Sequence, residues 1–115
     1  RIEGHRAIDE PLRHKASATF SNWGIDTVKS VCDAFSLQPT FEIWGSGGVR
    51  HGLDAAKLFA LGASTVGFAK PMLNAALRST DDVLAVMASI EYELKVAMFC
   101  TGSRVLSDLK EKACR

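Results

Sequence analysis

Two short apolar segments, each followed by a turn and then by a helical pattern, constrain the fold of this chain most strongly. The first segment, residues 40–44, is rich in β-formers and ends at a run of glycines. The second, residues 65–68, comes one helical pattern later and leads to a proline. Strands that alternate with helices in this way are typical of an α/β architecture with parallel strands. Because two strands do not form a stable sheet alone, we expect the segment to belong to a larger sheet.

Five segments have apolar residues at helical spacing or a residue typical of a helix end. Asp26 suits the N-cap position of the first, and Gly62 suits the position just after the second because glycine tolerates the left-handed conformation. Asp81 and Asp82 stand at the start of the longest segment, where the helix dipole favours negative charge. The predicted helices cover residues 26–35, 52–61, a segment opened by Pro71, 81–99 and 103–110.

Residues 1–22 are charged and irregular, and we interpret them as a surface excursion or loop, with a solvated or disordered terminus as the alternative. Residues 23–115 form the predicted folded part. The whole chain carries 14 basic and 13 acidic side chains. This balance argues against nucleic acid or a membrane surface as a partner, because both usually demand a strong basic excess. No apolar run approaches the roughly 20 residues that a membrane span needs.

The three cysteines, Cys32, Cys100 and Cys114, are widely spaced, odd in number and form no CxxC motif. We therefore expect neither a disulfide framework nor a structural zinc site, and a reducing, cytoplasmic setting fits. Cys32 and Cys100 lie in apolar segments, where cysteine usually behaves as a small buried hydrophobe.

The turn after the first strand, residues 45–50 (GSGGVR), has the composition of an anion-binding loop. Gly47 and Gly48 leave backbone N–H groups free and let a phosphate approach closely, because they carry no Cβ. Arg50 can pair with phosphate oxygens in a forked geometry, and the following helix adds the positive end of its dipole. The alternative is a tight turn from strand to helix with an arginine that faces solvent.

A second loop of this kind, residues 67–71 (GFAKP), also lies between a strand end and a helix. Ala69 and Lys70 offer backbone N–H groups, and Lys70 adds a positive charge, although it also fits a solvated surface lysine. Two adjacent loops of this type, typically after strands 7 and 8, hold a phosphate in (β/α)8 barrels. The order and spacing of the two loops favour a phosphate site over two unrelated turns.

The run GSGGVRHGLDAAKLFALGASTVGFAKPML, residues 45–73, resembles the C-terminal phosphate-binding segment of FMN-dependent barrels. Those barrels include type 2 isopentenyl-diphosphate isomerases and α-hydroxy-acid oxidases. Three further runs resemble segments of the isomerase family and cover most of the remaining chain. They are RIEGHR at residues 1–6, FSNWGIDT at 20–27 and ELKVAMFCTGSRVLSDLK at 93–110.

The resemblance implies an α/β fold in which residues 23–115 form part of a TIM (β/α)8 barrel, the C-terminal portion around strands 6–8 with its closing helices. A complete barrel typically needs about 250 residues, so we expect the N-terminal half of the barrel to lie outside this chain. The implied reaction converts isopentenyl diphosphate to dimethylallyl diphosphate in a homo-oligomer that uses FMN, NADPH and Mg2+. The family's catalytic and metal-binding residues lie upstream, so we expect this segment to be inactive alone.

By position, the implied flavin site falls in three segments of the chain. Thr27, in the WGIDT run, would contact the flavin nucleotide, although it also fits a capping role in the first turn of a helix. Asp26 stands where the family usually has proline, which places a carboxylate near the phosphate. The residues implied to hold the FMN phosphate are Gly47, Gly48, Arg50, Ala69 and Lys70.

Two alternatives to an isomerase segment remain at this point. A flavin-dependent 2-hydroxy-acid oxidase or dehydrogenase would share the glycine loop, but its catalytic histidine and arginine should appear shortly before that loop. Residues 20–40 contain neither residue type, which argues against this alternative. A non-catalytic phosphate-binding half-barrel would expose a sheet edge and an apolar face, and would therefore associate with itself or aggregate.

Overall fold

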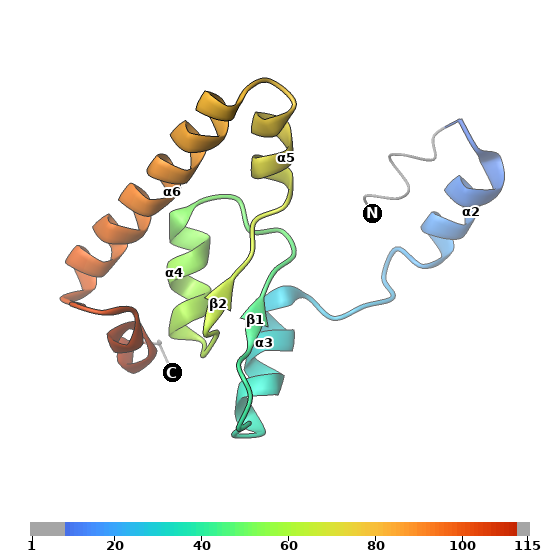
Figure 1. Ribbon diagram of the computed structural model, residues 1–115. Coiled ribbons are helices and arrows are strands. Elements are labelled where there is room, and N and C mark those ends of the chain that lie inside the picture. Colours follow the sequence, from blue (N-terminus) through green and yellow to red (C-terminus); the bar gives the residue numbers. More distant parts are fainter. Residues whose placement is uncertain (1–8, 113–115) are drawn as a thin grey trace.

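The computed structural model describes residues 9–112, which form helices around a two-stranded parallel sheet (Figure 1). The RIEGHR run and Cys114 lie outside the described residues. In chain order the elements are α2 (Pro11–Thr19), α3 (Thr27–Ser36), β1 (Trp44–Gly45), α4 (Gly52–Ala60), β2 (Thr65–Val66), α5 (Lys70–Ala76), α6 (Thr80–Thr101) and the 3-10 helix η1 (Leu106–Lys112). Helix α2 buries no side chain and lies apart from the other helices (Figure 1).

The sheet is parallel, as the alternation of strands and helices predicts, and α4 connects its two strands. Trp44 lies opposite Thr65, and Gly45 lies opposite Val66. Both strands are shorter than the predicted segments 40–44 and 65–68. A strand extends only as far as a neighbour accepts and donates hydrogen bonds, and in residues 9–112 each strand has the other as its one neighbour. The architecture is therefore α/β with parallel strands, but with less sheet than the pattern of β-formers predicts.

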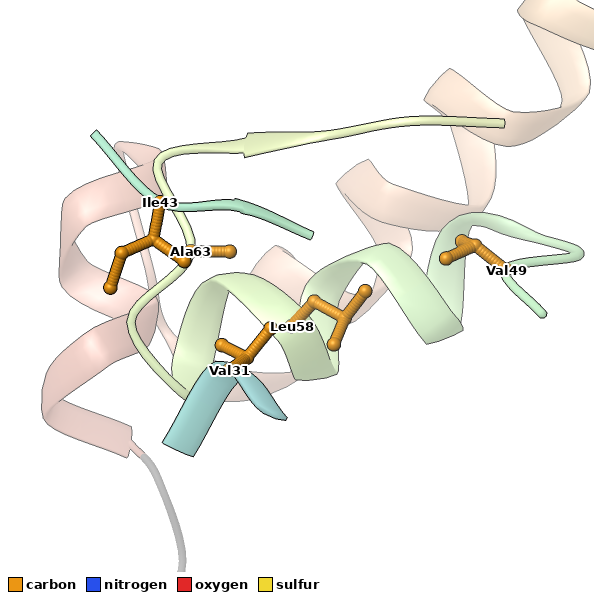
Figure 2. Close-up of a cluster of buried hydrophobic side chains, with 5 residues drawn as sticks. All are labelled: Val31, Ile43, Val49, Leu58 and Ala63. Atoms are coloured by element: carbon orange, nitrogen blue, oxygen red, sulfur yellow. The ribbon is translucent and has the colours of Figure 1, made fainter. Parts of the chain in front are cut away.

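Helix α4 is the centre of the packing, because apolar side chains from both of its sides are buried. Leu58 belongs to a cluster under the sheet, which Figure 2 shows. Phe59 belongs to a second cluster against α6 and η1. The first cluster consists of Val31, Ile43, Val49, Leu58 and Ala63, and the second of Ala55, Ala56, Phe59 and Leu109.

The predicted helix ends are largely confirmed by their capping groups. Asp26 caps α3, since its carboxylate accepts a hydrogen bond of 2.9 Å from the backbone N–H of Lys29. Gly62 follows α4 at φ +111, where a side chain would collide with the ring of Phe35. The last predicted helix, 103–110, is instead a 3-10 helix that begins later. Asp108 accepts hydrogen bonds from the backbone N–H groups of Arg104 and Val105, which keeps these residues in a turn.

Helix α6 has 22 residues but buries none of them completely. Leu94, Ala97 and Met98 pack against the second cluster, whereas Phe99 is 85% exposed. Cys100, which we expected to be buried, is exposed, because only one face of α6 has a neighbour in the described part of the chain. Cys32 is half-buried. Within residues 9–112, no helix is long and apolar enough to cross a membrane.

Candidate phosphate site

The loops that follow β1 and β2 lie side by side at the same edge of the sheet. The hydroxyl of Ser46 in the first loop donates a hydrogen bond of 3.2 Å to the carbonyl of Gly67 in the second. A Cβ on Gly67 would come within 3.2 Å of the Ser46 side chain, so glycine permits this approach. Between the loops lies a cavity of about 610 Å³. Its walls include five of the six residues predicted for the site: Gly47, Gly48, Arg50, Ala69 and Lys70.

The first loop has the backbone that its glycines predict. Gly47 has φ +96 and Gly48 has φ +76, both in the region that favours glycine. Within residues 9–112, their N–H groups donate no hydrogen bond to the protein. A Cβ added to Gly48 would have no atom within 4 Å, so this part of the loop is open. Successive free N–H groups in such a turn are suited to an anion.

Thr27, the sixth predicted residue, does not line this cavity. Its hydroxyl lies 2.7 Å from the carbonyl oxygen of Gly47 and 3.2 Å from that of Ser46. Since a hydroxyl has one proton, the shorter contact is the main hydrogen bond. Asp26, and not Thr27, caps α3. Thr27 therefore ties the start of α3 to the glycine loop from behind, next to a smaller cavity of about 130 Å³.

Arg50 is held by Asp54, which lies one helical turn further along in α4. One carboxylate oxygen of Asp54 accepts from both the backbone N–H and the side-chain Nε of Arg50, each at 3.2 Å. Burial of the Asp54 carboxyl disfavours its charge, but these hydrogen bonds outweigh burial and hold the pKa of Asp54 below its ordinary value. His51 is the N-cap of α4, since its Nδ1 accepts from the backbone N–H of Asp54 at 3.2 Å.

The start of α4 is also fixed from α6. The backbone N–H of Gly52 donates a hydrogen bond of 2.6 Å to the Glu93 carboxylate. A Cβ on Gly52 would lie 2.6 Å from the backbone nitrogen of Leu94, so only glycine allows the two helices to approach this closely. The Glu93 carboxylate already occupies this N–H group of the first turn. The free N–H groups of the glycine loop are therefore a better binding site for an anion than the N-terminus of α4.

The second loop makes fewer side-chain contacts. Ala69 and Lys70 are exposed at the start of α5, and Pro71 occupies the first turn of that helix, as predicted. Among the residues that the structure describes, Lys70 forms no ion pair, so its ammonium group is free to meet an anion in the cavity.

The interpretation of single residues from the sequence missed Asp54, Glu93 and the capping role of His51. The position of Asp54 in the first turn of α4 was a usable signal, because an acidic residue there can reach back to groups just before the helix. No local signal connects Gly52 with Glu93, which lies 41 positions further along the chain.

Residues 19–115 match the model of the FMN-dependent dehydrogenase family. The chain is 75% identical over 114 residues to the isopentenyl-diphosphate delta-isomerase of Legionella pneumophila strain Corby, covering 99% of this chain and 33% of that protein. It is 47% identical over 112 residues to the protein of that name from Bdellovibrio bacteriovorus, covering 97% and 32%. The chain therefore spans about a third of the length of the curated relatives it matches, less than the half expected above. By the extent of its match to the family model, the chain belongs to the FMN-dependent dehydrogenase family.

Proposed function

We propose that this chain is the C-terminal part of a type 2, FMN-dependent isopentenyl-diphosphate isomerase, in which it supplies the loops that hold the FMN phosphate. One observation carries the proposal: two consecutive βα loops converge on one cavity, and among residues 9–112 neither the glycine N–H groups on one side nor the lysine on the other has a protein partner. Family membership favours FMN as the ligand. The names of the relatives favour isopentenyl diphosphate as the substrate and dimethylallyl diphosphate as the product.

The residues around the cavity fit a phosphate monoester with two negative charges. Gly47 and Gly48 would donate backbone N–H groups, while the exposed guanidinium of Arg50 would offer a forked pair of donors. Ala69 and Lys70 would close the site from the second loop. Thr27 would act on the flavin nucleotide indirectly, through the loop carbonyls that it binds. When bound, reduced FMN supplies the proton-transfer chemistry, and these residues orient it.

In this proposal residues 23–115 form the part of a (β/α)8 barrel around strands 6–8, with β1 and β2 as two of its parallel strands. Large apolar side chains such as Phe41 (67% exposed) and Trp44 (73% exposed) would then be covered by the rest of the barrel. The described residues contain no group of three or more His, Cys, Asp or Glu side chains that could hold a metal. In this proposal the full-length protein is a cytoplasmic homo-oligomer. Its Mg2+ site for the substrate diphosphate, its NADPH site and its catalytic residues would lie in the part of the protein outside this chain.

Binding of flavins to the full-length protein tests the proposal. We expect the purified protein to bind FMN and, after reduction, to convert isopentenyl diphosphate to dimethylallyl diphosphate. Riboflavin, which has the same ring system and no phosphate, should bind far more weakly than FMN. Equal affinities for the two flavins would contradict a phosphate site. FMN binding without isomerisation, together with turnover of a 2-hydroxy acid, would favour the oxidase or dehydrogenase alternative.

A further inference from the structure

The contact between Arg50 and Asp54 has a geometry that an ordinary surface ion pair does not need. The same oxygen, Oδ2 of Asp54, accepts from both ends of Arg50, its backbone N–H and its side-chain Nε. The arginine is therefore fixed at its main chain and at the start of its guanidinium group. The Arg50 side chain is 74% exposed, whereas that of Asp54 is 19% exposed. A half-buried carboxylate thus anchors a cation that points out of the protein.

Within the described part of the chain, this arrangement leaves the outer donors of Arg50 without a protein partner. A guanidinium group carries five N–H donors, and the contact at Nε uses one of them. The two terminal amino groups remain, and they are the pair that grips a phosphate in the forked geometry. Arg50 lines the cavity between the two loops, alongside Gly47 and Gly48. Asp54 does not line that cavity; it lines the smaller cavity beside Thr27, which shares Gly47, Gly48 and Arg50 with the cavity between the loops.

Stability alone gives a weak reason for the pair. An ion pair that includes a side chain as exposed as that of Arg50 contributes little to stability, because solvent screens the charge. Orientation gives a stronger reason, because ordering a flexible side chain on binding lowers the affinity about two- to tenfold, and prior ordering removes that cost. The main effect of the contact is therefore to orient the Arg50 guanidinium group before a ligand binds.

We propose that Asp54 is a positioning residue that holds Arg50 ready to grip the phosphate of the flavin nucleotide. This inference rests on the proposed function, since it takes the ligand of the cavity to be FMN. If Asp54 instead competed with the phosphate for Arg50, its removal would tighten FMN binding. The sign of the change in FMN affinity separates the two.

The test measures dissociation constants of FMN and riboflavin for the full-length protein by quenching of flavin fluorescence. Asp54→Ala should weaken FMN binding about three- to tenfold, as expected for an arginine that must be ordered on binding, and leave riboflavin binding unchanged. Asp54→Asn retains one acceptor oxygen and should fall between Asp54→Ala and the parent. A purely structural role would weaken both flavins together, so the ratio of the two constants is the decisive readout.

A matched control exists at the start of α6, where Arg78 lies just before the helix and Asp82 lies in its first turn. Arg78 and Asp82 form the same kind of pair at the same spacing, with Nε 2.7 Å from the carboxylate oxygen, and neither lines the cavity. Asp82→Ala should leave the affinities for both flavins unchanged. In an Arg50→Ala background, which keeps the backbone contact with Asp54 but lacks the guanidinium group, Asp54→Ala should cost much less FMN affinity than it does in the parent.

Three results would overturn the inference: unchanged or tighter FMN binding by Asp54→Ala, equal losses for both flavins, or a full additional loss in the Arg50→Ala background. If Asp54→Ala does not fold, the ratio of the constants for Asp54→Asn decides the same question. A parent protein that binds FMN no better than riboflavin would instead refute the proposed function.

Discussion

The two loops of the site are built in different ways. The first, Ser46 to Arg50, is held by side chains from elsewhere in the fold: Thr27 on α3 binds its carbonyls, and Asp54 on α4 binds its arginine. Val49 in the middle of this loop is buried in the core cluster. The second loop, Gly67 to Lys70, touches the first through Ser46 and packs Phe68 against both core clusters, whereas its exposed end, Ala69 and Lys70, is shaped by the start of α5.

The difference teaches where the site is rigid. A loop fixed by tertiary contacts keeps its N–H groups in one arrangement before a ligand arrives, which reduces the cost of binding. The exposed end of the second loop, Ala69 and Lys70, has no such contacts from elsewhere in the described part of the fold and is easier to substitute. We therefore expect substitutions around the first loop to have larger effects than equivalent substitutions in the second.

The largest effect is expected where α4 meets α6 just after the first loop. Gly52→Ala would press a methyl group against the backbone of Leu94, which cannot move without shifting α6. We expect a loss of about 3 kcal/mol or more in the free energy of unfolding, at the upper end of overpacking costs. Unfolding of the full-length protein in urea measures it.

Gly102→Ala is the control for Gly52→Ala. Gly102 ends α6 at φ +66, and a Cβ there would have no atom within 4 Å. Only the cost of the left-handed conformation applies, about 1–2 kcal/mol. If the two substitutions cost the same, the close approach of α4 and α6 is not what makes Gly52 necessary.

The next largest effect compares the two cations of the site directly. Arg50→Ala should weaken FMN binding about 10- to 100-fold, because charge-assisted hydrogen bonds contribute about 1.5–3 kcal/mol. Lys70→Ala should weaken it only about two- to fivefold, as for an exposed charge without a fixed geometry. Fluorescence titrations at low salt measure both constants. A larger loss for Lys70→Ala would reverse the proposed ranking of the loops.

The parts of the site that the sequence could predict are those that depend on local signals. Residues 44–50 and 65–71 were identified from local signals: β-formers, glycines at strand ends and a proline at a helix start. The cap at Asp26 and the turn at Gly62 were also local, and both are confirmed. The contacts of Thr27 with Gly47 and of Gly52 with Glu93 depend on how helices pack, which no local pattern determines.

The errors have the same physical origin. The strands were predicted too long because β-forming side chains are not sufficient: a strand also needs neighbours along its whole length, and each strand has one among residues 9–112. Cys100 was predicted to be buried because its segment is apolar, but burial depends on which face of α6 meets α4. The hydrogen bonds of Asp108 replaced a regular helix by a 3-10 helix.

A smaller effect on FMN affinity is expected from Thr27, which contacts the first loop from α3. Thr27→Val keeps the shape of the side chain and removes the hydroxyl that binds Gly47. We expect the affinity for FMN to fall about fivefold, since a typical hydrogen bond contributes about 1 kcal/mol. Thr27→Ser keeps the hydroxyl and should bind FMN like the parent. If Thr27→Ser binds FMN as weakly as Thr27→Val, packing of the methyl group matters more than the hydrogen bond to Gly47.

The smallest effect is a dependence of stability on pH that belongs to the first loop alone. The pKa of Asp54 is depressed in the folded state, so its charge contributes stability that is fully present above its ordinary value near 3.8 and is lost as the pH falls below that value. Asp54→Asn should therefore lose stability relative to the parent at neutral pH but approach it in acid. No such convergence is expected for Lys70→Gln in the second loop, because among the described residues Lys70 pairs with no carboxylate. Urea unfolding of each variant and the parent at neutral pH and in acid measures the difference. A constant gap between Asp54→Asn and the parent at all pH values would mean that the carboxylate acts through its shape and not through its charge.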